Sequence, residues 1–196
     1  MTTPVIYTFT GKRLNPLAFT EAEVCIEDIA HALALCNRFA GHTREPISVA
    51  QHSVYAACLV PQQFKLQALL HDASESYLGD MTHWLKQSPA LAGFRDAEDA
   101  LQRLIYRRYG VPEEDHISVK YVDRLLVRYE GLRGFGEHWH VLGVRPEGKE
   151  VQSDYPDLTS EEIYSVDQLY GGWQFWPWRE AEKQFLRMFD VLYNGG

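Results

Sequence analysis

The sequence has few cysteines, no long apolar run and no excess of basic residues, and each of these absences excludes a class of protein. The 3 cysteines are odd in number and form no CxxC pair, so neither a disulfide framework nor a zinc ribbon is supported. We therefore expect a reducing compartment. No stretch approaches the roughly 18 apolar residues of a membrane span, and the opening MTTPVIYTFTGKR lacks the apolar segment of a signal peptide. These features predict a cytoplasmic protein with no membrane partner.

Positive charge is scarce as well. Lys and Arg total 19 against 27 Asp and Glu, which gives a formal net charge of -8. Such a surface repels a phosphate backbone, so we expect no nucleic-acid polymer as a partner. A small anion can still bind where a divalent cation and a few local bases offset the repulsion.

Length and composition predict one globular domain that spans residues 1–196. The chain of 196 residues is long enough to bury one core and too short for two comfortable domains. Hydrophobic residues make up 45% and charged residues 23%, and no repetitive block interrupts them. The chain should therefore fold without a partner.

Hydrophobic periodicity predicts an all-α fold. Val5, Tyr7 and Phe9 alternate with polar neighbours, which indicates a short N-terminal strand or extended arm. The stretch between Gly131 and Ser160 is rich in Gly, Pro, Asp and aromatics, which predicts a long irregular loop or lid before the C-terminal helix. Elsewhere apolar residues recur at helical spacing. The segments with this spacing are residues 23–38, 48–61, 64–79, 96–109, 113–130 and 177–192.

The run LLHDASESYLGD places His71 and Asp72 next to each other at the end of an apolar segment. Adjacent helix positions point about 100° apart, so both side chains can bind one ion only where two sides converge on a cleft. Glu75 lies four residues after His71, one helical turn onward, where a carboxylate can hold a water beside the ion. The alternative is an exposed polar stripe with no partner.

Three segments together carry a resemblance to a known superfamily. SVAQHS, then LLHDASE with GDM, then YVDR resemble the HD-domain phosphohydrolases. The resemblance covers most of the chain and implies an HD-domain helical bundle that binds a divalent ion. The residues that match its metal ligands are His52, His71, Asp72 and Asp123.

Two imidazoles and two carboxylates form a mixed nitrogen and oxygen shell, which suits Mn, Co, Fe, Ni or Zn better than an all-oxygen magnesium site. Taken alone, His52 would more often be a hydrogen-bonded helix histidine, and Asp123 could pair with Arg124 on the surface. Their place in the ordered set favours ligation. The identity of the metal stays open.

The segment IEDIAHALALCNRFAGHT and the HDASE and GDM block are similar to bacterial 5′-deoxynucleotidases and phage dATP triphosphohydrolases. This resemblance implies that Glu75 activates water and that Asp80 protonates the leaving group. The deoxynucleotidases usually carry Trp at the position of Phe39, and Arg38 could instead satisfy the last carbonyls of its helix. The residues that match substrate contacts are Arg38, Phe39, His42, His83 and Lys86.

The resemblance predicts an enzyme that hydrolyses a small-molecule deoxynucleotide, in the host cytoplasm if the chain is phage-encoded. We expect release of triphosphate from a dATP-like dNTP, with dNMP hydrolysis as the nearest alternative. A signalling-nucleotide hydrolase and a non-catalytic, metal-stabilised interaction module are further alternatives. Related hydrolases often assemble, so a homo-oligomer is expected. Histidines outside this set, His31, His138 and His140, are explained as well by ordinary buried or surface positions.

Overall fold

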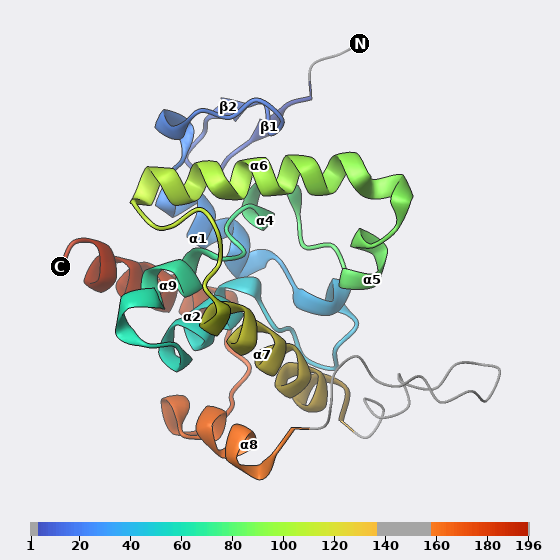
Figure 1. Ribbon diagram of the computed structural model, residues 1–196, viewed down its shortest axis with the longest axis vertical. Coiled ribbons are helices and arrows are strands. Elements are labelled where there is room, and N and C mark those ends of the chain that lie inside the picture. Colours follow the sequence, from blue (N-terminus) through green and yellow to red (C-terminus); the bar gives the residue numbers. More distant parts are fainter. Residues whose placement is uncertain (1–3, 137–157, 196) are drawn as a thin grey trace.

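The computed structural model describes residues 4–136 and 158–195, and it confirms the predicted all-α fold. Figure 1 shows the helices arranged around one central helix, residues 49–59, with a short hairpin near the N-terminus. Among the described residues, no helix is both long and apolar enough to cross a membrane. The strands are β1 (Ile6–Tyr7) and β2 (Arg13–Leu14), and the helices are α1 (Ile26–Leu35), α2 (Val49–Leu59), α3 (Lys65–Leu70), α4 (Glu75–Leu78), α5 (His83–Lys86), α6 (Ala92–Tyr109), α7 (Ile117–Phe135), α8 (Ser160–Asp167) and α9 (Trp178–Tyr193).

Helix α2 is the centre of the bundle. It packs against α1, α3, α7 and α9, and every residue from Val49 to Ala57 is buried. The Ser48 side chain caps it by accepting a hydrogen bond from the Gln51 backbone N–H. A helix that is buried on all sides is a core helix, so its polar residues must find partners inside the protein. His52, with no exposed surface, is one of them.

The N-terminal arm is the antiparallel hairpin of β1 and β2, in which Ile6 pairs with Leu14. Its loop is tied to α1 by Asp28, whose carboxylate accepts hydrogen bonds from the backbone N–H and the hydroxyl of Thr10. Beside it the ring of Phe9 stacks on that of His31 at a centroid distance of 3.9 Å. The hairpin therefore covers one side of α1 and confirms the expected extended arm.

The prediction of one continuous helix over residues 64–79 was wrong, because a turn divides this segment into two helices. The chain forms α3 to Leu70, a turn over residues 71–74, and α4 from Glu75. Backbone hydrogen bonds in the turn reach three residues back, as from Ala73 N–H to the Leu70 carbonyl at 3.0 Å. His71 and Asp72 lie in this turn and not on a regular helix.

The irregular loop predicted between Gly131 and Ser160 begins too early, because α7 continues as a helix to Phe135. Gly134 is needed for packing, since a Cβ atom there would lie 2.5 Å from the Thr43 side chain. Residues 137–157, including His138 and His140, lie outside the described part of the chain. Helix α8 was not predicted, although Thr159 and Glu162 form a capping box at its start.

Candidate metal centre

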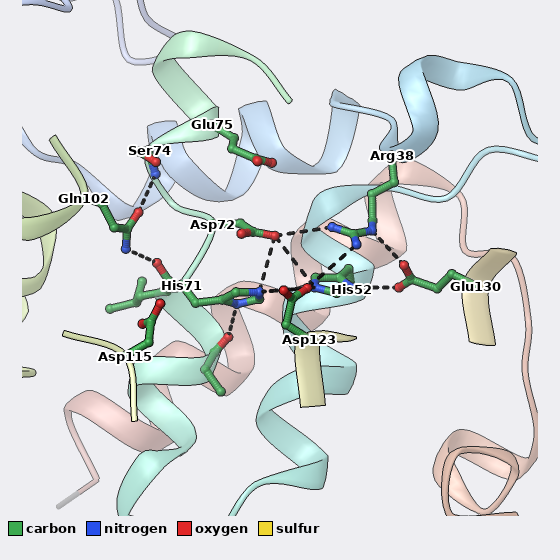
Figure 2. Close-up of polar contacts among 12 residues, drawn as sticks. Arg38, His52, His71, Asp72, Ser74, Glu75, Gln102, Asp115, Asp123 and Glu130 are labelled. Carbon is green, nitrogen blue, oxygen red and sulfur yellow. Dashed lines mark hydrogen bonds and ion pairs between the residues drawn. The ribbon is translucent and has the colours of Figure 1, made fainter. Parts of the chain in front are cut away.

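The side chains predicted to bind a metal come together from separate parts of the fold, as Figure 2 shows. His52 is on α2, His71 and Asp72 are in the turn after α3, and Asp123 is on α7. The two imidazole Nε2 atoms lie 3.2 Å apart. Asp72 Oδ2 lies 3.4 Å from His71 Nε2 and 3.7 Å from His52 Nε2. Asp123 Oδ1 lies 3.3 Å from His52 Nε2 and 3.8 Å from His71 Nε2.

These distances suit one cation at His52, His71 and Asp72, with Asp123 Oδ1 close to both imidazoles. Metal–ligand bonds of about 2.1 Å place two ligand atoms about 3.0 Å apart at a right angle and about 3.4 Å apart at a tetrahedral angle. The observed separations run from 3.2 to 3.8 Å. The ligand atoms of His52, His71 and Asp72 also all lie within 4.8 Å of one another. This cluster could therefore hold a metal ion.

Each imidazole is hydrogen-bonded through Nδ1, so that its other nitrogen, Nε2, faces the group of predicted ligands. His71 Nδ1 donates to the Ala68 carbonyl at 2.8 Å, and His52 Nδ1 donates to Glu130 Oε1 at 2.8 Å. With a proton on each Nδ1, both neutral rings point a lone pair at the other across 3.2 Å. Two facing lone pairs repel unless a proton or a metal cation lies between them. The arrangement therefore requires positive charge at its centre.

The electrostatics of the metal-free centre agree with this requirement. Burial lowers the pKa of the His71 imidazole, but the Asp72 and Asp123 carboxylates outweigh it and raise that pKa to about 10. Burial opposes ionisation of Asp123, yet hydrogen bonds from His52 and His71 hold the pKa of its carboxyl well below the usual range. The centre thus attracts protons strongly, and a divalent ion would satisfy the same negative charge.

Glu130 belongs to the hydrogen-bond network of this centre and is not among the predicted site residues. It is fully buried. Its Oε2 accepts a hydrogen bond from Arg38 Nε at 2.7 Å, and its Oε1 accepts one from His52 Nδ1. Arg38 continues the network to Asp72 Oδ2 at 3.3 Å. Glu130 lies seven residues after Asp123, two helical turns along α7, and that shared face was the available signal.

Arg38 is therefore neither a solvated helix-end cation nor free for substrate in this structure. It is buried in a 3₁₀ segment, η2 (Arg38–Gly41), and is bound by Glu130 and Asp72. Its neighbours Phe39 and Ala40 have φ values of 56° and 51°, which is strained backbone for residues with side chains. The Phe39 ring packs edge-on against Phe135 at 5.4 Å. The chain thus turns sharply at the point where Arg38 enters the centre.

Glu75 and Lys86 form a second cluster beside the centre. Lys86 Nζ lies 3.1 Å from Glu75 Oε1 and 2.7 Å from Glu98 Oε1, so its ammonium is held by two carboxylates. Among the described residues, the buried Oε2 of Glu75 has no hydrogen-bond partner. Burial and the nearby Asp72 and Asp80 charges raise the pKa of Glu75 well above its usual value. Such a carboxyl is suited to accepting or donating a proton near neutral pH.

The remaining predicted site residues lie further out. Asp80 follows α4, its backbone N–H bonds the Cys36 sulfur at 3.4 Å, and burial raises the pKa of its carboxyl. His42 is exposed at the end of η2, and His83 is exposed at the start of α5. His31 lies elsewhere, 3.1 Å from Glu182 on α9.

Comparison with known proteins places the chain in a family. It is 38% identical over 141 residues to a protein named "Uncharacterized protein YfdR" from Escherichia coli (strain K12), which covers 70% of this chain and 78% of that protein. The chain belongs to the family of YfdR. A second relative, "Uncharacterized protein RCAP_rcc00048" from Rhodobacter capsulatus, is 34% identical over 143 residues, or 65% of this chain and 72% of that protein. No protein-family model matches the chain.

For this YfdR relative we expect metal-induced stabilisation to grow with pH. A proton on His71 stabilises the metal-free protein fully below the unfolded-state pKa of about 6.5, and that contribution is lost as pH rises towards about 10. A metal must displace this proton, so its affinity should rise by up to about tenfold per pH unit over the same window. The shift in melting temperature on adding Co²⁺, measured against EDTA, should be larger at pH 8.5 than at pH 6.5. An equal shift at both values would contradict proton competition.

Proposed function

We propose that the protein is an HD-type, metal-dependent phosphohydrolase that acts on deoxynucleotides. The observation that carries this proposal is the pair of imidazole Nε2 atoms, 3.2 Å apart, with Asp72 and Asp123 beside them and each Nδ1 bonded away from the centre. An ordered His, His-Asp, Asp set in three separate elements is what the HD superfamily uses. The unpaired oxygen of Glu75 beside that set adds a group able to take a proton.

His52, His71, Asp72 and Asp123 would hold the ion, which is best taken as Mn, Co, Fe, Ni or Zn because half of its protein ligands are imidazoles. When bound, such an ion supplies a Lewis acid for a phosphoryl oxygen and makes water acidic enough to ionise near neutral pH. Glu130 and Ala68 set the orientation of the two rings. Arg38 holds Glu130 and Asp72 in place and offsets part of their negative charge.

Glu75 is the proposed base. Its raised pKa and the free Oε2 allow it to accept a proton from water as the water oxygen forms a bond to the α-phosphorus. Lys86, bound to Oε1, fixes the direction of the carboxylate. Asp80, whose pKa is also raised, donates a proton to the O5′ atom as the bond from phosphorus to O5′ breaks. Water is consumed, and the products are a deoxynucleoside and the released phosphate chain.

A dATP-like dNTP is the proposed substrate, on the strength of the similarity of IEDIAHALALCNRFAGHT and HDASE to phage dATP triphosphohydrolases. One observation favours a dNMP as the second candidate. Arg38 and Lys86, both cations expected to contact the substrate, are each bound by two carboxylates at 3.3 Å or less. A monophosphate needs fewer additional cations than a triphosphate does.

Product analysis tests the proposed function. The purified protein with dATP and Mn²⁺ or Co²⁺ should release deoxyadenosine and triphosphate, and EDTA should stop the reaction. Release of deoxyadenosine and orthophosphate from dAMP, without turnover of dATP, would support the second candidate. Turnover only of cyclic dinucleotides or guanosine polyphosphates would indicate a signalling-nucleotide hydrolase. If no nucleotide is hydrolysed with any of the five metals, the enzyme proposal is wrong and an interaction module remains.

A further inference from the structure

A side chain from another helix occupies the break between α3 and α4. In a continuous helix the Ser74 N–H would donate to the Leu70 carbonyl, four residues earlier. Here Gln102 of α6 stands between the two groups. Its Oε1 accepts from the Ser74 N–H at 3.0 Å, and its Nε2 donates to the Leu70 carbonyl at 2.7 Å. Figure 2 shows this amide beside the turn that carries His71 and Asp72.

We propose that Gln102 is a positioning residue for metal binding, which inserts its amide into one helical hydrogen bond and thereby sets the geometry of the His71-Asp72 pair. Insertion of a side chain into the backbone ladder is a recognised cause of a sharp helix break. The backbone bonds that remain, from Ala73 to Leu70 and from Glu75 to Asp72, span three residues instead of four. The turn is therefore tighter than an α-helix at the residues that carry the ligands.

The turn places both adjacent side chains at one centre, where His71 Nε2 and Asp72 Oδ2 lie 3.4 Å from each other. The Gln102 amide supplies both the acceptor for the Ser74 N–H and the donor for the Leu70 carbonyl, the two backbone groups that the break separates. Without Gln102 these two groups could pair with each other, and α3 would continue through the metal-binding turn.

Other side chains on the same face of α6 bind neighbouring segments and so fix the position of Gln102. Arg95, Glu98 and Gln102 are spaced three and four residues apart, which puts them on one face of the helix. Arg95 donates to the Ser88 carbonyl at 2.9 Å, and Glu98 binds Lys86 at 2.7 Å. The same face therefore fixes α5, the Lys86 ammonium and the metal-binding turn relative to one another.

The proposal rests on the proposed metal centre and is tested by metal affinity, without any substrate. Co²⁺ titration should give Gln102→Leu at least about tenfold weaker binding than wild type, the loss typical when a residue that orients metal ligands is removed. In the metal-free protein, hydrogen exchange at the Ser74 amide should change in the same variant. Gln102→Glu keeps the volume and the acceptor for Ser74 but loses the donor to Leu70, so it should bind more weakly than wild type and more tightly than Gln102→Leu. The control is Arg103→Leu, at an exposed position on α6 where Arg103 pairs with Asp99.

The outcomes separate the two proposals. If wild-type protein binds no Co²⁺, the metal centre itself is wrong. If wild type binds Co²⁺ and both Gln102 variants bind it equally well, the positioning role is refuted while the centre stands, even when their melting temperatures fall. If Gln102→Leu does not fold, the Co²⁺ affinity of Gln102→Glu tests the positioning role instead, because this variant keeps the side-chain volume. Affinity equal to wild type in folded Gln102→Glu would overturn the proposal.

Discussion

We expect Asp72→Ala to abolish metal binding and the proposed hydrolysis together. Asp72 Oδ2 approaches both imidazoles, at 3.4 and 3.7 Å, and it also receives Arg38 at 3.3 Å. Without it the centre loses one of its two carboxylates, and Arg38, still paired with Glu130, is left with less negative charge around it, which disfavours a cation. We expect metal affinity to fall by at least about 100-fold, and activity at micromolar metal to become undetectable. Metal content after dialysis and turnover measure the two effects in the same preparation.

The matched control for this variant is Asp99→Ala, an aspartate on the exposed side of α6 that pairs with Arg103 at 3.9 Å. An exposed pair of this kind contributes little to stability, so the control should keep the metal and full activity. Asp72→Ala protein that is folded and retains stoichiometric metal would show that the ion binds elsewhere. The assignment of the centre would then be wrong.

Glu75→Gln should lower turnover while leaving metal affinity nearly unchanged. Glu75 lies beside the four proposed ligands without being one of them, and its proposed role is to take a proton through an oxygen that has no other partner among the described residues. An amide of the same size cannot take that proton. We expect metal affinity within about twofold of wild type and turnover lower by about 10² to 10⁴, the range typical of a general base. Steady-state kinetics at saturating metal and a metal titration measure the two quantities.

Glu161→Gln makes the same chemical change at an exposed residue of α8 and should leave both quantities unchanged. Loss of metal in Glu75→Gln would mean that this carboxylate is a ligand. Full turnover would mean that another group accepts the proton. Either result would require a different mechanism from the one proposed.

The four proposed metal ligands were predicted from the resemblance to the HD superfamily, and local pattern placed each of them on or beside a helix. His52 follows a capped helix start, and His71-Asp72 ends an apolar run. Asp123 precedes the buried Leu125 and Leu126 on α7. Capping and helical periodicity act within a few residues, so the sequence shows where these helices lie, while the role of ligand rests on the resemblance. The four side chains accordingly meet as expected.

The supporting residues could not be predicted in the same way, because their roles come from partners far along the chain. Glu130 orients His52 across 78 positions, and Gln102 reaches Leu70 across 32. Nothing near Gln102 in the sequence marks it apart from any other helical glutamine. Arg38 and Lys86 were expected to contact the substrate, but buried carboxylates from other elements, Glu130 and Glu75, bind them in this structure. Tertiary pairing decides which charged groups remain available to a ligand.

The most direct test of the account is a crystal structure of Co²⁺-loaded protein with anomalous diffraction recorded at the cobalt edge. The account predicts one strong peak within about 2.2 Å of Nε2 of His52, Nε2 of His71 and a carboxylate oxygen each of Asp72 and Asp123. An empty centre, or a cobalt peak held by other side chains, would contradict it.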